Sequence, residues 1–131
     1  MAWLLVVIGS ALGGMARYGI SGAVARRVGE TFPWGTLVVN VSGSFVIGVF
    51  AALVAPGGAL AGERMAGAFV MVGLCGGYTT FSAFSLQTLN LMNDGECLYA
   101  GAYIGLSVAL CLIAVWAGAV LAAGINTMKW I

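Results

Sequence analysis

The sequence predicts an all-α integral membrane protein with four transmembrane helices. Of its 131 residues, 62% are hydrophobic and only 7% are charged, whereas an ordinary soluble domain carries about 25% charged residues. Four apolar runs are each long enough to cross a hydrocarbon core, which takes about 20 helical residues. These runs are continuous and lack the alternating pattern of outer-membrane strands, which favours helices over a barrel.

The four spans are separated by short connections that hold turn residues and most of the charges. The predicted spans are Trp3 to about Val24, Trp34 to about Ala55, about Ala66 to Met92, and about Leu98 to Ile125. Short connections make consecutive helices antiparallel neighbours, so both termini are expected on the same side. We expect residues 1–131 to form a single four-helix domain.

The basic residues do not favour one orientation in the membrane. Lys and Arg usually concentrate in cytoplasmic loops, but here Arg26 and Arg27 lie on one side and Arg64 and Lys129 on the other. Arg17 lies within the first span, and its long side chain can extend to the membrane surface, so it adds weakly to the positive charge of the first side. This balance permits an antiparallel homodimer, although a single orientation set by another signal is equally open. The net charge of +1 gives no basic stripe for nucleic acid.

The third span carries the most unusual segment, Gly76–Ser85, which begins with two glycines and contains Thr79-Thr80 and two phenylalanines. Adjacent glycines followed by β-branched and aromatic residues make a poor helix interior. We therefore predict a break near Gly76–Thr80. Carbonyls freed inside a membrane must be buried in protein or line a cavity, where they can bind a cation.

Polar and aromatic residues recur on single helix faces in three spans. The aligned sets are Thr36, Asn40 and Ser44 in the second span, Phe81, Phe84, Ser85 and Thr88 in the third, and Tyr103, Ser107 and Cys111 in the fourth. Taken singly, each polar residue fits ordinary hydrogen bonding between helices. Together they favour a polar path through the membrane.

At this point the sequence resembles a known family. The segments Gly13–Tyr18, Gly35–Phe45 and Gly76–Ser85 are similar to the signature motifs of the Fluc (CrcB-type) fluoride channels. The resemblance implies passive export of fluoride across the inner (plasma) membrane of a cell, most simply a bacterium. It also implies a dual-topology homodimer with two pores and a central structural sodium ion.

The resemblance assigns roles to individual positions. It implies a pore lined by Asn40, Thr80, Phe81, Ser82, Phe84, Tyr103 and Ser107, a vestibule with Arg17, and sodium held by the carbonyls of Gly76 and Thr79. Cys111 stands where a hydroxyl residue is usual. The positive edge of a Phe ring can coordinate a small anion, and a path without a fixed charge lets the ion leave again.

Three other functions fit the sequence less well. An enzyme is disfavoured because the chain has no His and its four acids, Glu30, Glu63, Asp94 and Glu96, all lie in predicted loops. A small proton-coupled multidrug exporter needs an intramembrane carboxylate, which every span lacks. A structural subunit of a membrane assembly would explain the glycines but not the aligned polar faces.

Overall fold

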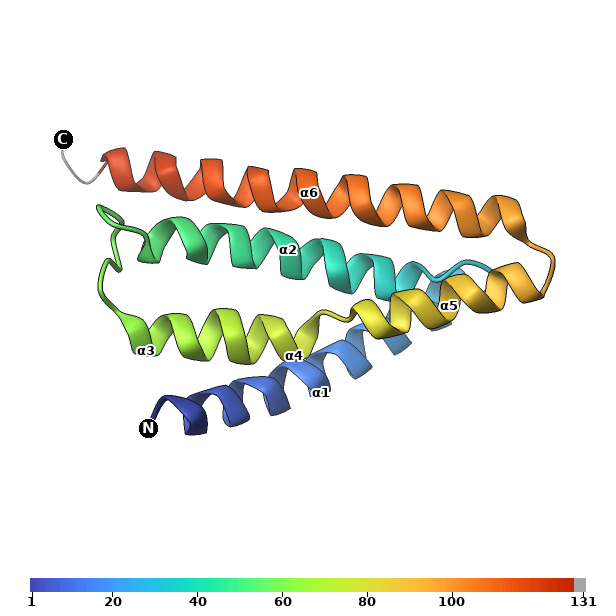
Figure 1. Ribbon diagram of the computed structural model, residues 1–131, viewed down its shortest axis with the longest axis horizontal. Helices are drawn as coiled ribbons and strands as arrows, with labels where there is room; N and C mark the ends of the chain where they lie inside the picture. Colours follow the sequence, from blue (N-terminus) through green and yellow to red (C-terminus); the bar gives the residue numbers. More distant parts are fainter. Residues whose placement is uncertain (129–131) are drawn as a thin grey trace.

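Four long apolar spans run side by side in the computed structural model, which describes residues 1–128 (Figure 1). The helical segments are α1 (Ala2–Val28), α2 (Trp34–Val54), α3 (Arg64–Gly67), the π-helix η1 (Ala68–Cys75), α4 (Gly76–Tyr78), α5 (Phe81–Asn93) and α6 (Cys97–Met128). The spans are Ala2–Val28, Trp34–Val54, Arg64–Asn93 and Cys97–Asn126. Each has the length and composition to cross a membrane, which confirms the predicted multi-pass architecture.

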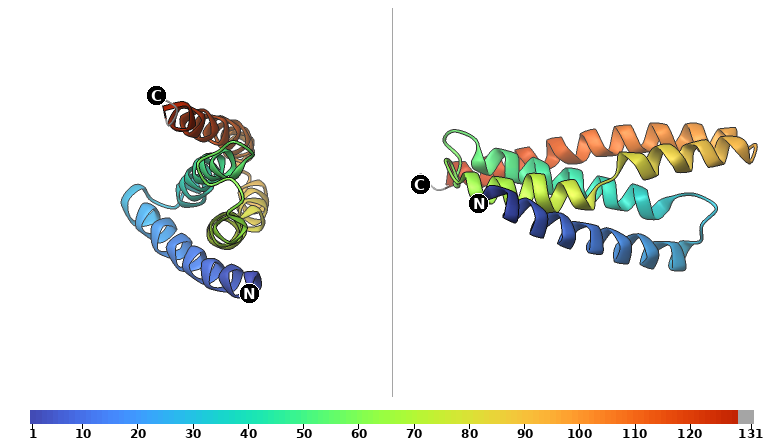
Figure 2. Two further views of the ribbon diagram at one scale, coloured as in Figure 1. Left: turned by 90° about the vertical axis from the view of Figure 1, so that its left-hand side faces the viewer. Right: turned by 60° about the horizontal axis from the view of Figure 1, so that its bottom comes forward.

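The second span lies at the centre of the bundle. Helix α2 contacts every other helical segment, with its longest contact along α6, while α1 packs along η1 and α4 (Figure 2). The start of α1 and the end of α6 lie at the same end of the bundle in Figure 1, as antiparallel neighbours require. The connections at 29–33 and 94–96 lie at the opposite end.

Two helices are longer than the sequence pattern indicated. Helix α1 continues to Val28, so Arg26 and Arg27 belong to its last turn rather than to the following loop. Cations at that position interact favourably with the carbonyl end of a helix, which helps the helix extend beyond its apolar part. Helix α6 likewise continues to Met128. Lys129, which was counted with Arg64 among the basic residues of one membrane side, lies outside the described residues.

The third span is broken within the predicted segment, but not at its glycines. Gly76 and Gly77 are helical, and the chain becomes extended at Thr79 (ψ 158°) and Thr80 (φ −152°, ψ 115°). Thr80 then caps α5, because its Oγ1 accepts a hydrogen bond from the Ala83 amide at 3.1 Å. The predicted location of the break is thus confirmed: the two glycines remain helical, and the two β-branched threonines that follow Tyr78 are the extended residues.

Glycine instead permits the closest helix contacts. A Cβ atom at Gly77 would lie 2.5 Å from the Ser10 carbonyl oxygen and 2.7 Å from the Ser10 Cα. A Cβ at Gly48 would collide with the carbonyl group of Val115 on α6. Small residues allow this approach of backbones in a bundle where lipid removes the hydrophobic drive for association.

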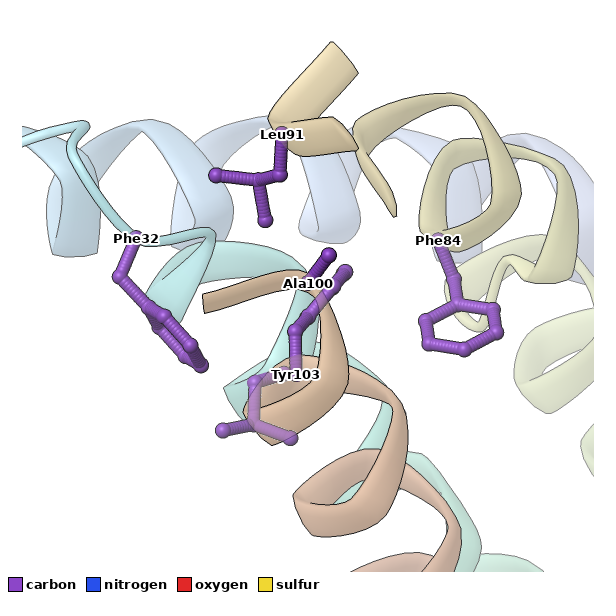
Figure 3. Packing of buried hydrophobic residues seen from close by; sticks show 6 residues of the cluster. Phe32, Phe84, Leu91, Ala100 and Tyr103 are labelled. Carbon is purple, nitrogen blue, oxygen red and sulfur yellow. The ribbon is translucent and has the colours of Figure 1, made fainter. Parts of the chain in front are cut away.

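Most large apolar side chains point outward, as expected for helices that face lipid or another chain; Trp116 and Leu112, for example, are exposed. One buried cluster lies where the loop before α2 meets α5 and α6. Figure 3 shows Phe32, Phe84 and Tyr103 around it. The Tyr103 ring lies 5.5 Å from the Phe32 ring and 5.1 Å from the Phe84 ring. This cluster holds the first turns of α6 against α5.

Candidate functional site

A cavity of about 390 Å³ lies beside the break in the third span. It combines amide, hydroxyl, sulfur and aromatic groups from α2, the third span and α6, and none of its lining side chains is charged. The lining residues are Asn40, Gly43, Ser44, Ile47, Met71, Cys75, Gly76, Thr79, Thr80, Phe81, Phe84, Ser107, Val108, Cys111 and Leu112. The bundle therefore gathers at one place most of the residues that the sequence suggested.

The Asn40 side chain forms hydrogen bonds with the extended backbone at the break. Its Nδ2 donates to the Thr80 carbonyl at 3.0 Å, and the Thr80 amide donates to Asn40 Oδ1 at 2.8 Å. A primary amide carries both a donor and an acceptor, so one side chain satisfies both backbone groups of Thr80. The Asn40 Nδ2 group keeps a second hydrogen for another acceptor.

The two phenylalanines of α5 differ sharply in their surroundings. Phe81 is 77% exposed, whereas Phe84 is 9% exposed and packs against Tyr103. Their ring centroids lie 5.2 Å apart, with an angle of 48° between the planes. Such a large exposed ring at the rim of a cavity is available for contact with another chain or an ion.

Ser107 is the buried polar residue of α6 in this cavity. The residue is 7% exposed, and among the described residues its Oγ is the buried side-chain polar atom without a hydrogen-bond partner. A buried hydroxyl left unpaired destabilises the protein by about 1–3 kcal/mol. An acceptor that enters the cavity would remove this penalty.

The break also removes the regular helical partners of two carbonyls. The Thr80 amide, which would bond the Gly76 carbonyl in a continuous helix, donates to Asn40, and the Ala83 amide donates to Thr80 Oγ1 instead of the Thr79 carbonyl. Gly76 is exposed, and a Cβ built on it would approach only the Met71 carbonyl oxygen, at 3.9 Å. The carbonyl oxygens of Gly76 and Thr79 are ligands of the type that a hard cation such as sodium prefers.

Arg17 lies elsewhere, in an open cavity of about 1210 Å³ at the end of the bundle that holds the loops 29–33 and 94–96. This cavity contains a second arginine, Arg26, together with the acidic residues Glu30, Asp94 and Glu96. A single chain therefore supplies charges of both signs here. Thr80 lines this cavity as well as the smaller one.

Two of the predicted pore residues lie outside the smaller cavity. Ser82 is exposed and within 3.2 Å of Thr80 Oγ1, and Tyr103 is fully buried, donating its hydroxyl hydrogen to Gln87 Oε1 at 2.9 Å. Gln87, which also lines the larger cavity, was missed by the sequence reasoning. Its position one turn after Phe84, as an uncharged polar residue within a span, was the signal.

The positions of the acidic residues bear on the proton-coupled alternative. Glu30, Asp94 and Glu96 lie in connections at one end of the bundle, and Glu63 directly precedes α3 at the other. Among the described residues, no group of three or more His, Cys, Asp or Glu side chains could hold a metal ion. Within residues 1–128, no Asp or Glu lines the smaller cavity. The cavity therefore has no carboxylate that could exchange protons for a cationic substrate.

Comparison with known proteins adds independent evidence. The family described as CrcB-like protein, Camphor Resistance (CrcB), matches residues 4–119. A protein of Methylocella silvestris named fluoride-specific ion channel FluC is 57% identical over 129 residues, which cover 98% of this chain and 98% of that protein. Proteins of the same name from Opitutus terrae and Rhodospirillum rubrum are each 54% identical and cover 97% and 96% of this chain, and 96% and 98% of their own lengths.

These matches extend over all four spans and include the parts of α2, the third span and α6 that meet in the smaller cavity. The chain therefore belongs to the CrcB/FluC fluoride-channel family, a family of multi-pass membrane ion channels and not of enzymes.

Proposed function

We propose that this chain conducts fluoride passively across the inner membrane of a bacterial cell, as an antiparallel homodimer with two pores and a central structural sodium ion. The observation that carries the proposal is the uncharged cavity beside Thr80, where Asn40, Ser107 and the Phe81 and Phe84 rings come together. The names of the full-length relatives support fluoride as the ion.

The chemistry of the cavity suits a small, strongly hydrated anion. The second Nδ2 hydrogen of Asn40 and the unpartnered hydroxyl of Ser107 replace part of the water shell. The positive ring edges of Phe81 and Phe84 contribute further contacts without a full charge. Because no Lys or Arg lines this cavity, the anion is bound weakly enough to leave, as conduction requires.

A path of this kind continues through Thr80. This residue lines both the smaller cavity and the larger one that holds Arg17. Fluoride would enter through the larger cavity, pass the hydroxyl groups of Thr80 and Ser82, and reach the phenylalanine pair. Gln87 lines the larger cavity and accepts a hydrogen bond from the buried Tyr103 hydroxyl, so it forms a polar wall at the start of this passage.

Two features support a second copy of the chain against this face. Phe81 is 77% exposed, and Gly76 is exposed although nothing within one chain requires a glycine there. A partner in the opposite orientation would bury the ring and bring the Gly76 and Thr79 carbonyls of both copies together around sodium. Carbonyls of interrupted helices bind sodium in other membrane proteins.

Fluoride efflux from liposomes that contain only the purified chain, with chloride as the control ion, tests the function. Phe81→Ile and Phe84→Ile retain bulk but remove the ring edge, so we expect dimers that assemble normally and lose fluoride efflux. If the rings only fill space, the same changes cost less than about 1.5 kcal/mol of stability and leave efflux near normal. Phe45→Ile and Phe69→Ile, which lie outside the cavity lining, are the matched controls.

Cysteine tags in the loops 29–33 and 55–63, which lie at opposite ends of the bundle, test the antiparallel arrangement. With two orientations, an impermeant thiol reagent labels each tag partly from either side of intact vesicles. A tag that reacts from one side only would contradict dual topology. Additional lysines in one loop are expected to bias insertion and abolish efflux until an oppositely biased copy is co-expressed.

A further inference from the structure

Cys111 occupies a place in the smaller cavity that the fluoride path does not explain. It lines the cavity together with Asn40, Phe81 and Ser107 and is a half-buried free thiol. It lies one turn after Ser107 on the same face of α6. A thiol is a weak hydrogen-bond donor, so it gives a hard anion such as fluoride little stabilisation.

Two observations indicate that this part of the cavity accepts a ligand, and a soft one. The Ser107 Oγ is buried and has no hydrogen-bond partner among the described residues, so the wall of this cavity contains an unsatisfied polar group. The Met71 thioether and the Cys75 thiol, both on η1, line the same cavity as Cys111 on α6, so sulfur comes from two helices. Thiolate and thioether groups select soft metal ions over hard ones.

The three cysteines differ in their access to such a ligand. Cys75 lines the cavity but is only 3% exposed, and Cys97 is exposed at the start of α6, outside the cavity lining. Cys111 alone of the three combines a place in the cavity with an accessible thiol. An uncharged reagent can reach it through an apolar region that a charged one would enter only at a high desolvation cost.

We propose that Cys111 is a reactive site for neutral mercurials, such as methylmercury chloride, and that the adduct closes the cavity to fluoride. In the reaction the Cys111 S–H and the Hg–Cl bonds break, a S–Hg bond forms, and a proton and a chloride ion are released. No oxidation or reduction takes place. The methylmercury group would occupy space beside Phe81 and Ser107, in the same cavity. The block of conduction rests on the proposed fluoride function, whereas the reactivity of the thiol does not.

Variants with a single thiol test this inference in the full chain, reconstituted in liposomes. Cys75→Ser/Cys97→Ser keeps only Cys111, Cys75→Ser/Cys111→Ser keeps only Cys97, and Cys97→Ser/Cys111→Ser keeps only Cys75. Methylmercury chloride should remove most of the fluoride efflux of the first variant and leave the other two unchanged, each relative to its own untreated rate. Mass spectrometry should find one adduct per chain at Cys111, and fluoride in the bath should slow its formation.

The possible failures are distinguishable. Absence of efflux from untreated liposomes would contradict the proposed function, and the adduct spectrum would still test the reactivity of Cys111. An unmodified Cys111, or loss of efflux through Cys75 or Cys97 instead, would overturn the inference. A complete adduct at Cys111 with normal fluoride efflux would overturn the placement of this thiol in the conduction path. A dithiol that removes mercury should restore efflux, which separates blockage from denaturation.

Discussion

Asn40→Ala is expected to destabilise the fold, independently of any effect on fluoride. The substitution removes the bond from Nδ2 to the Thr80 carbonyl at 3.0 Å and the bond from the Thr80 amide to Oδ1 at 2.8 Å. Thr80 is 9% exposed, so both backbone groups lose their partners in a largely buried position. Each unpaired group costs about 1–3 kcal/mol, which makes about 2–6 kcal/mol in total. Water that enters the enlarged cavity moves the value toward the lower end.

Thermal unfolding in detergent, followed by circular dichroism and size-exclusion elution, measures this loss. Amide hydrogen exchange provides a local readout, because the Thr80 amide should exchange much faster in Asn40→Ala. Ser44→Ala is the matched control: Ser44 is half-buried, lies on the same face of α2 and lines the same cavity. Its hydroxyl holds none of the Thr80 backbone groups, so we expect a change within about 0.5 kcal/mol. If Asn40→Ala had the same thermal unfolding midpoint as Ser44→Ala, and its Thr80 amide remained protected from exchange, the structural role given to Asn40 would be refuted.

Four further predictions concern packing, assembly and coupling. Gly48→Ala should destabilise the chain by about 1–3 kcal/mol because its Cβ meets the α6 backbone, whereas Gly101→Ala, in open space, should leave the thermal unfolding midpoint unchanged. Gly77→Ala should weaken the packing within each chain, while Gly76→Ala should weaken only the dimer in size-exclusion elution; an unaffected Gly76→Ala dimer would argue against a partner at this position. Replacing sodium by a large organic cation should lower the thermal stability of the dimer, and equal stability in both salts would count against a structural sodium ion. Fluoride efflux should persist when the pH gradient is collapsed at constant fluoride gradient, because no carboxylate or His lies in the cavity; efflux that stops would indicate a proton-coupled carrier.

The spans and their antiparallel order could be predicted from the sequence because hydropathy alone fixes which segments enter a membrane. The geometry of the break could not. Thr79 and Thr80 are extended because Asn40, forty residues earlier in the chain, satisfies the Thr80 backbone, and a local pattern contains no such information. The glycine pair and the β-branched residues after it indicated the right region, but Gly77 itself remains helical and permits the close contact with α1.

Much of the candidate site followed from helical spacing. The alignment of Ser107 with Cys111 on α6 was visible in the sequence, and both line the smaller cavity. Tyr103 shares that spacing but is fully buried against Gln87 and Phe84. Spacing defines a face of a helix, but the neighbouring helices decide how deep each residue of that face is buried. The eight-residue π-helix η1 likewise has no local signal that we identified.

The bond pattern between Asn40 and Thr80 has a consequence for the order of events during biosynthesis. A third span alone in lipid would leave the Thr80 amide and carbonyl without partners if it were bent, so a continuous helix is its most stable form on insertion. The second span precedes it in the chain and already carries the amide that replaces the missing helical bonds. The third span therefore becomes bent only when the two spans meet. In a ribosome-bound chain that ends before Thr80, the Asn40 side chain is already present but has not yet formed its hydrogen bonds to the Thr80 backbone.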